Sequence, residues 1–453
     1  MKAVRLAAAI GAGLVLFWFV LGMTPGDVDE QGPDAPPCAD CNLVLITFDA
    51  LRADRIGAFG YAKPTTPELD TFAEDAAVFT DAMSQSGTTI SSLPSLFTGK
   101  FPHTDQLLQP VRTLGVREEE TLLAERLQAA GWNTAAVVAH EYAKGRFGFA
   151  AGFDSFDDEY GETELASATL SRAQAALSEL RPPFFLWVHF RQPHGPYEST
   201  DEDFARFYDG PDDGITLQNS RYRDALRAAR KRGEWVGKFT WGAKLRVLSP
   251  SLLRQLGAKY DGNLRRGDRA FGELMRSLDA HAAPAETVVV VAADHGESLG
   301  EHGIFDHNTL YWGGIHTPVL LRAPGLTPGE RPWPVSNVDI LPTVLRLLGQ
   351  PLPEDLRGRD LLDSDRDDVP QIAEYANRRT IKLGDWKYME NPPGGDGPAL
   401  FDVGRDPDET ENLLDSEPEV AAGLAAQLAA IAGRAPGLDD PLRDKLRALG
   451  YLR

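Results

Sequence analysis

Three side chains in this sequence have the types that hold a divalent cation, and each follows an apolar run of strand length. Asp49 ends the run 42–48, whereas Asp294 and His295 come directly after the run 287–293. Carboxylates supply hard oxygen ligands, and an imidazole nitrogen widens the choice of ion towards zinc or manganese. We therefore expect these three residues to be metal ligands. The alternative is that Asp294 caps a following helix and that His295 is an ordinary buried polar residue.

Two further apolar runs lead to histidines. The run 184–190 is followed by the segment Gln192-Pro-His194-Gly-Pro-Tyr, and the run 134–139 ends at His140. Such runs alternate with longer helical stretches, which is typical of an α/β domain. In open α/β sheets, ligands bind outside the carboxyl ends of the strands. Aspartate and histidine at four such ends together predict a metal or acid–base site.

The composition is that of a large acidic globular protein. The chain has 453 residues, of which 42% are hydrophobic and 25% are charged, so it can bury a sizeable core. Its 46 basic and 67 acidic residues give a net charge of −21, which argues against nucleic acid as a partner. Only two cysteines occur, Cys38 and Cys41, and outside the cytoplasm we expect this C-x-x-C pair to form a local disulfide.

The N-terminus predicts export from the cytoplasm. Lys2 and Arg5 precede an apolar run at 6–23, whose length lies between that of a signal-peptide core and a membrane-spanning helix. We favour an uncleaved signal anchor within residues 1–23, which leaves the rest facing the periplasm or cell exterior. A cleaved signal peptide, giving a secreted protein, is the alternative. Residues 24–41 are rich in Pro, Gly and Asp and are expected to form a flexible linker.

Several segments resemble the sulfatase family, within the alkaline-phosphatase superfamily. In chain order they are Asn42–Gly57, Thr65–Asp70, Ala293–Gly303, Asp306–Tyr311, Pro318–Gly325, Asp339–Thr343, Leu400–Leu413 and Leu446–Tyr451. The resemblance implies an α/β fold in residues 42–370, with an alkaline-phosphatase/sulfatase-like mixed sheet sandwiched by helices. It also implies a small C-terminal subdomain in residues 371–453, where we expect a short antiparallel sheet.

By this resemblance Asp49, Asp294 and His295 hold one divalent metal ion, which is manganese, zinc or calcium. Many sulfatases have two adjacent acids at the first of these positions, but Ala50 replaces the second acid here. That substitution suggests a metal site with fewer carboxylate ligands, as in the metal-dependent phosphoethanolamine and lipoteichoic-acid-type transferases of the superfamily. It also weakens the specific case for calcium.

The nucleophile motif departs from the family pattern. Sulfatases carry Cys or Ser in C/S-x-P-S-R, and counting back from Gly99 without gaps places Thr89 at that position. Ser91 then replaces the motif proline and Leu93 replaces its arginine. An alternative alignment makes Ser92 the nucleophile but demands a three-residue deletion, so we prefer Thr89.

Threonine at this position changes the expected chemistry. Its β-carbon carries a methyl group, so Thr89 cannot yield the aldehyde of formylglycine, and no formylglycine is expected. A threonine alkoxide held on the metal can still attack phosphorus and form a phosphothreonine, which favours phosphate esters. A helix from Ile90 onward would place Thr89 at a helix N-terminus, which suits an anionic ester. Pro94 is compatible with that helix only if it starts late or kinks. The alternative is that Thr89 is merely an N-cap.

Three histidines are expected to bind the ester. His194 matches the family segment D-P-H-x-P-Y and is expected to contact the ester or protonate the leaving group. His307 lies four residues before Tyr311, where many sulfatases place a substrate-binding lysine, and is expected to bind the ester or act as general acid. His140 sits beside the position of another such lysine and is a further substrate-binding candidate. His302 is expected to be structural.

Three functions stay open at this point. The first is an exported, metal-dependent hydrolase of sulfate or phosphate esters that uses Thr89. The second is a phosphodiesterase or phosphoryl-group transferase that acts on envelope glycans or lipids, and the third is an inactive protein that binds anionic glycans. The segment 221–259 has eleven basic residues against two acids. It is either a solvated amphipathic helix pair or a lid or membrane-facing patch that attracts anionic glycans or lipid headgroups.

Overall fold

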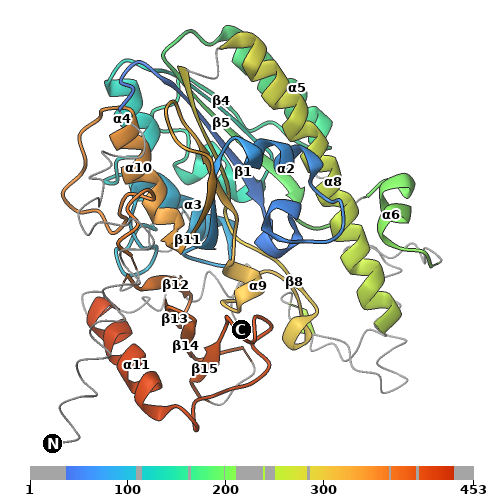
Figure 1. The fold of residues 1–453 in the computed structure, drawn as a ribbon. Coiled ribbons are helices and arrows are strands. Elements are labelled where there is room, and N and C mark those ends of the chain that lie inside the picture. The colour runs from blue at the N-terminus through green and yellow to red at the C-terminus, as the bar shows by residue number, and fades with distance from the viewer. Residues whose placement is uncertain are drawn as a thin grey trace, which may run out of the picture. The chain divides into compact units, whose positions relative to one another are not determined.

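One mixed sheet forms the centre of the fold (Figure 1). The computed structural model describes residues 37–108, 115–161, 165–197, 199–210, 238–239, 250–282, 286–366, 369–393 and 397–432. In spatial order the strands are β11 (Gly329–Ser336), β2 (Ala77–Met83), β10 (Val319–Arg322), β7 (Thr287–Ala293), β1 (Asn42–Asp49), β5 (Phe184–Pro193), β3 (Asn133–Val138) and β4 (Ser155–Asp157). The five strands from β7 to β4 run parallel, whereas β10 is antiparallel to both of its neighbours. The predicted α/β mixed sheet is therefore confirmed.

Helices cover both faces of this sheet, and the alternation of side chains along β1 shows which helices lie on which face. Val44, Ile46 and Phe48 share a core with α2 (Pro67–Glu74), α5 (Ala166–Glu179) and α8 (Pro250–His281). Leu43 and Leu45 share the opposite core with α3 (Thr89–Thr98), α4 (Leu123–Ala129) and α10 (Ile340–Leu347). The two helix groups lie on opposite sides of the sheet in Figure 1. Because both faces are covered, the central strands are continuous apolar runs.

A second, antiparallel sheet follows the large one in the chain. Its strands, in order, are β12 (Gln371–Tyr375), β13 (Arg378–Leu383), β14 (Trp386–Glu390) and β15 (Ala399–Asp402). Helix α11 (Pro418–Ala432) packs against it through a shared apolar cluster that includes Ile381, Leu400 and Leu424. This sheet confirms the predicted C-terminal antiparallel strands, while the predicted domain boundary at residue 370 stays a prediction.

The remaining elements are short. They are α6 (Asp201–Phe207), α9 (Trp312–Ile315), the small sheet of β6 (Lys238–Phe239), β9 (Ile304–Asp306) and β8 (Ser298–Leu299), and single 3-10 turns at 53–55, 57–59, 141–143, 145–147, 301–303 and 337–339. Within the described residues, no helix has the length and apolar character needed to cross a membrane. The predicted anchor at 6–23 and the basic stretches 221–237 and 240–249 lie outside those residues.

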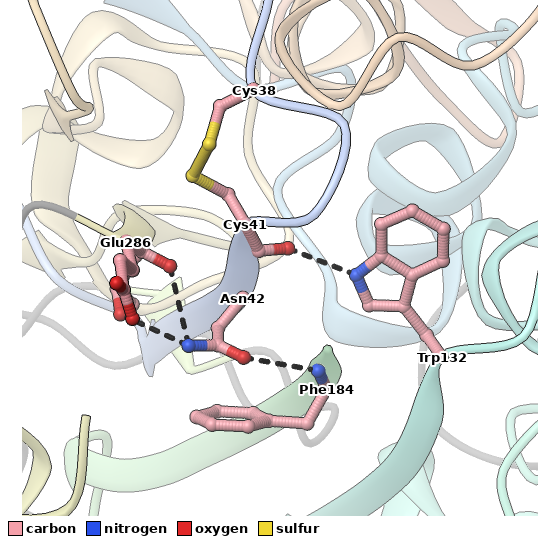
Figure 2. Close-up of a disulfide and its surroundings, with 7 residues drawn as sticks. Cys38, Cys41, Asn42, Trp132, Phe184 and Glu286 are labelled. Carbon is pink, nitrogen blue, oxygen red and sulfur yellow. Dashed lines mark hydrogen bonds between the residues drawn. A yellow bond between two sulfur atoms is a disulfide. The ribbon is translucent and has the colours of Figure 1, made fainter. Parts of the chain in front are cut away.

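The predicted disulfide is present directly before the central strand. Cys38 and Cys41 are joined with their Cα atoms 5.4 Å apart (Figure 2). The carbonyl oxygen of Cys41 accepts a hydrogen bond from Trp132 Nε1 at 3.0 Å, and the Cys38 amide donates to the Leu347 carbonyl at 2.6 Å. The Asn42 side chain then accepts from the Phe184 amide at the start of β5. The chain is thus fixed to the domain at the point where β1 begins.

Candidate metal and ester site

The carboxyl ends of four neighbouring parallel strands carry the polar residues that the sequence singled out. Asp49 is the last residue of β1, Asp294 follows β7, and His140 lies two residues after β3 in extended backbone. Alternation along each strand places these residues on the face that α3 covers, because Leu45, Ala292 and Val138 belong to the core on that side. The sheet order therefore brings residues together that are far apart in the sequence.

Asp49 lies at the centre of the site and is fully buried. Its Oδ1 is 3.5 Å from His295 Nε2, whereas its Oδ2 is 3.5 Å from His140 Nδ1 and 4.0 Å from His189 Nε2. The Asp49 carbonyl accepts a hydrogen bond from the His194 amide at 3.1 Å, which holds the loop after β5 against the end of β1. Each carboxylate oxygen thus faces a different group of histidines.

Asp294 and His295 lie in a loop rather than at a helix start. Residues 294–297 connect β7 to β8, so the alternative that Asp294 caps a following helix is wrong. Asp294 Oδ1 accepts hydrogen bonds from the amides of Ala50 at 3.2 Å and His295 at 2.8 Å. Asp294 Oδ2 is buried, makes no hydrogen bond within the described part of the chain, and lies 3.5 Å from His295 Nε2.

Thr89 begins α3, and its hydroxyl contacts the ring of His295. Its Oγ1 is 3.2 Å from His295 Nε2. Thr88 is the N-cap of the helix, so the alternative that Thr89 serves merely as the cap is wrong. The helix runs from Thr89 through Pro94 and does not start later, although Pro94 cannot donate to the Ile90 carbonyl. Ser92, the alternative nucleophile, donates from Oγ to the Thr89 carbonyl at 3.4 Å.

Four imidazole rings form a row along the site. The ring centroids of His140 and His194 are 5.1 Å apart, those of His194 and His307 are 4.9 Å apart, and those of His307 and His295 are also 4.9 Å apart. All of the residues predicted for catalysis, ester binding and metal binding therefore lie in one cluster. His302, which we expected to be structural, stacks on the Tyr311 ring with centroids 3.7 Å apart.

Two residues of the cluster were not predicted from the sequence. His189 lies inside β5, fully buried, and its Nδ1 is 2.8 Å from Thr47 Oγ1. A single histidine within an otherwise apolar strand was the available signal. Glu297 is also fully buried, and its Oε1 is 3.9 Å from His307 Nδ1. It belongs to the segment after β7 that contains Asp294 and His295. Its proximity to His307 could not be predicted from the sequence, because it depends on the fold.

Hydrogen bonds and burial indicate which forms the histidines take. His295 Nδ1 is 2.8 Å from the Gly296 carbonyl, which can only accept, so Nδ1 carries a proton and Nε2 faces the carboxylates. Burial lowers the pKa of His189 to about 4. Burial, together with the neighbouring His194 and His189, holds the pKa of His140 well below its usual value. Burial therefore favours the neutral form of His189 and His140, which is the form that ligates a metal.

The donor set fits a divalent cation. One donor atom each from Asp49, His189 and Asp294 lie within 4.8 Å of one another. His189 Nε2 and Asp294 Oδ2 are buried and make no hydrogen bond within the described residues, although a buried polar atom normally has a partner. A bound cation would satisfy both atoms. Carboxylate oxygens mixed with imidazole nitrogens suit zinc or manganese better than calcium.

Comparison with known families identifies the chain. The family model described as Sulfatase matches residues 41–350. This chain belongs to the sulfatase family. A second model, described as N-sulphoglucosamine sulphohydrolase, C-terminal, matches residues 300–433. The resemblance seen in the sequence motifs is thus confirmed.

Named relatives of this sulfatase-family chain include enzymes from animals and bacteria. It is 27% identical over 303 residues to arylsulfatase K of Xenopus laevis, covering 60% of this chain and 55% of the relative. It is 25% identical over 442 residues to an ulvan-active sulfatase of Formosa agariphila, covering 85% and 79% respectively. The chain therefore spans about half the length of the arylsulfatase K relatives that it matches.

Solved structures share the fold. The phosphonate monoester hydrolase of Agrobacterium radiobacter superposes with a TM-score of 0.68 at 19% identity, covering 87% of this chain and 96% of that one. A protein in complex with its substrate D-glucosamine-2-N,6-O-disulfate gives a TM-score of 0.69 at 17% identity, covering 89% and 99%. These likenesses confirm the sulfatase-like fold of the family member described above.

Proposed function

We propose that the chain is an exported, metal-dependent hydrolase of anionic esters that prefers phosphorus esters to sulfate esters, with Thr89 as its nucleophile. The observation that carries this proposal is the position of the Thr89 hydroxyl. It lies at the start of α3 and 3.2 Å from His295 Nε2, beside the buried carboxylates of Asp49 and Asp294. A threonine there supports attack on phosphorus, and its methyl group prevents conversion to formylglycine.

The chain's own groups support a two-step displacement. The N-terminal end of α3 favours an anionic ester next to Thr89, because backbone N–H groups and the positive end of the helix dipole face it. Thr89 Oγ1 attacks phosphorus while the bond from phosphorus to the leaving alcohol breaks, which gives a phosphothreonine. Water then attacks this phosphorus and releases the phosphoryl group, restoring the Thr89 hydroxyl. A cation held by Asp49 and Asp294, together with the neighbouring His295 and His189, would offset the negative charge of the ester and favour the alkoxide of Thr89.

His307 is the proposed proton donor to the leaving alcohol. It borders His295 and His194, and the carboxylate of Glu297 lies 3.9 Å from its Nδ1. An imidazole can carry a proton near neutral pH and give it up in the displacement step. His194 and His140 line the same row, and direct contact with the ester is the role that the sequence predicts for them.

The test compares esters and Thr89 variants in the full-length protein supplied with Mn²⁺ or Zn²⁺. Activity is measured on matched p-nitrophenyl esters: a phosphodiester, a phosphonate monoester, a phosphate monoester and a sulfate. We expect phosphorus esters to be cleaved, and Thr89→Ala to lower kcat on the order of a thousandfold or more without loss of bound metal. Thr89→Ser should keep most of the activity, and Ser92→Ala is the matched control. Sulfate turnover that survives in Thr89→Ala would overturn the proposal.

An assay of the same protein with an added alcohol distinguishes hydrolysis from group transfer. A phosphothreonine can be discharged by an alcohol as well as by water, which is the basis of the phosphodiesterase or transferase alternative on envelope glycans or lipids. With the phosphate monoester as substrate, adding glycerol and measuring glycerol phosphate against free phosphate gives the partition between the two. An inactive glycan-binding protein would instead lack bound metal and leave every ester intact.

A further inference from the structure

The segment 308–316, which contains α9, supports the loop that precedes the proposed nucleophile. The Asn308 amide donates a hydrogen bond to the Gly87 carbonyl at 2.9 Å, two residues before Thr89. The two backbones are in direct contact there, because a Cβ atom at Gly87 would lie 2.2 Å from the Thr309 carbonyl oxygen. A shift of the segment would therefore be transmitted to the start of α3.

The same segment also supports the loop that follows β7. The Gly296 amide donates to the Gly314 carbonyl at 2.9 Å, and the Glu297 amide donates to the Gly313 carbonyl at 3.0 Å. A Cβ atom at Gly296 would lie 2.2 Å from the Gly313 carbonyl oxygen, so these two backbones are also in direct contact. The placement of the two loops relative to each other thus depends on how segment 308–316 is held.

A carboxylate from the C-terminal part of the chain holds the start of α9. Glu409, in the loop after β15, accepts a hydrogen bond through Oε2 from the amide of Trp312, the first residue of the helix. Lys387 of β14 donates to the other oxygen, Oε1. The side chains of Lys387 and Glu409 are 0% and 1% exposed. The Lys387 ammonium also lies 5.9 Å from the centroid of the Tyr311 ring, directly before α9.

The backbone at Glu409 supports a specific role for this carboxylate. Its φ is +54°, in the left-handed region that residues other than glycine and asparagine rarely adopt. Such a conformation persists where surrounding contacts hold the residue in place. Asparagine would suit this backbone better, but its side chain is one methylene shorter than that of glutamate. The contacts that hold Glu409 are those with the Trp312 amide and Lys387.

We propose that Glu409 is a positioning residue for the reaction at Thr89, so that the C-terminal sheet takes part in arranging the site. Glu409 fixes the start of α9, and segment 308–316 in turn holds the loops before α3 and after β7. Lys387 offsets the charge of the Glu409 carboxylate and orients it towards the Trp312 amide. The effect on catalysis rests on the function proposed above, whereas the effect on the two loops does not depend on which ester is cleaved.

The first test separates the hydrogen bond to Trp312 from the charge of the pair. Removing one charge alone would leave the other buried and unpaired, which destabilises the fold whether or not Glu409 positions anything. Both charges are therefore removed: Lys387→Met/Glu409→Gln keeps an acceptor oxygen for the amide, and Lys387→Met/Glu409→Leu does not. Amide hydrogen exchange is measured by mass spectrometry on the full-length proteins. In peptides covering 294–299 and 306–311 we expect exchange roughly tenfold faster in the Leu variant than in the Gln variant.

An ion pair of the same sheet provides the matched control. Arg379 of β13 and Glu390 of β14 are joined at 2.8 Å, and Arg379→Met/Glu390→Leu should leave exchange in both peptides unchanged. Peptides from β3 should exchange equally in all of the proteins, which excludes general loosening. If the Leu variant does not fold, Lys387→Met/Glu409→Asn replaces it, because asparagine suits the backbone at this position but is too short. Equal exchange in the Gln variant and the variant without the contact would overturn the inference.

The second test is how the loss divides between kcat and KM on the p-nitrophenyl phosphodiester. Displacing a nucleophile lowers the rate of bond formation more than the binding of the ester. We therefore expect kcat of Lys387→Met/Glu409→Leu to fall on the order of a hundredfold while KM changes less than about threefold, and the Gln variant to keep most of its kcat. Equal kcat in the two variants would overturn the role in catalysis. An unaltered protein that cleaves no ester would contradict the proposed function alone, and the exchange comparison would still decide whether Glu409 holds the two loops.

Discussion

At the scale of single residues, His307 has a role that leaving-group chemistry can isolate. A general acid matters most when the departing alcohol is a poor leaving group, because p-nitrophenolate departs without a proton. We expect His307→Gln to lower kcat/KM roughly a hundredfold or more for alkyl phosphonate esters, and less than about tenfold for p-nitrophenyl esters. A leaving-group series on both proteins measures this. Equal losses across the series would show that His307 binds the ester but donates no proton, and His302→Gln is the control.

Thr47 is a second residue whose contribution can be measured, although it touches no ester. Its hydroxyl contacts His189 Nδ1 at 2.8 Å and accepts a hydrogen bond from Trp187 Nε1 at 2.9 Å. Such a group fixes the ring of a metal-ligating histidine, and its loss typically weakens metal affinity about 10–100-fold. We expect that decrease for Thr47→Val in a chelator competition experiment. Thr343→Val, which also removes a buried hydroxyl, should leave the metal affinity unchanged. Unchanged affinity in Thr47→Val would show that His189 is not a ligand.

At the scale of elements, α2 and α8 are joined by a carboxyl group that caps one helix from another. Asp268 of α8 accepts hydrogen bonds from the amides of Glu68 at 3.1 Å and Leu69 at 2.8 Å in the first turn of α2. Burial raises the pKa of Asp268 to about 7, against the lowering effect of these amides and of Arg265. The folded state therefore binds the Asp268 proton more tightly than the unfolded state does.

This raised pKa predicts that the free energies of unfolding of the protein and of its Asp268→Asn variant differ by an amount that depends on pH. Between about pH 4 and pH 7 the folded state holds more protons at Asp268 than the unfolded state does. The stability that this proton contributes is therefore lost as the pH rises through that range. The free energy of unfolding of the Asn variant, measured in urea relative to the unaltered protein, should rise by about 2–3 kcal/mol from pH 5 to pH 8. A difference that does not change with pH would mean that the amides and Arg265 keep Asp268 ionised.

At the scale of the whole molecule, the apolar N-terminal run and the disulfide both bear on the compartment. We propose export, supported by the Cys38–Cys41 disulfide, since such bonds persist in oxidising compartments. Residues 1–41 fused to a β-lactamase reporter should confer resistance to ampicillin, which requires export. Replacing Lys2 and Arg5 by glutamate should reduce that resistance, because the positive charges orient the apolar run. A reporter that stays in the cytoplasm would contradict the proposal.

Fractionation of cells that produce the whole chain distinguishes an anchor from a signal peptide. An uncleaved anchor predicts full-length chain in the membrane fraction, and a cleaved signal peptide predicts a shortened chain in the soluble fraction. N-terminal sequencing of the mature protein decides between them. Binding to anionic vesicles, compared between the unaltered protein and a variant with Arg230, Lys231 and Arg232 neutralised, tests the membrane-facing role predicted for the basic segment.

The local features of this protein could be predicted from its residues in order along the chain. The apolar runs predicted β1 and β7 with Asp49 and Asp294 at their ends, because a buried strand needs continuous apolar residues and ends where polar ones appear. The C-x-x-C spacing predicted the disulfide, since two cysteines three residues apart can meet within one turn. The motifs also placed Thr89 at the start of a helix.

How these features combine depends on the folded arrangement of the strands. The order β7-β1-β5-β3 sets which strand ends are neighbours, and it depends on crossover connections and burial between distant segments rather than on any local pattern. For that reason His189 was missed, because a histidine inside a buried strand shows its importance only when Asp49 of the adjacent strand lies beside it. The division of the Asp49 oxygens between two groups of histidines is likewise a property of four strand ends meeting at one edge, and no single segment contains it.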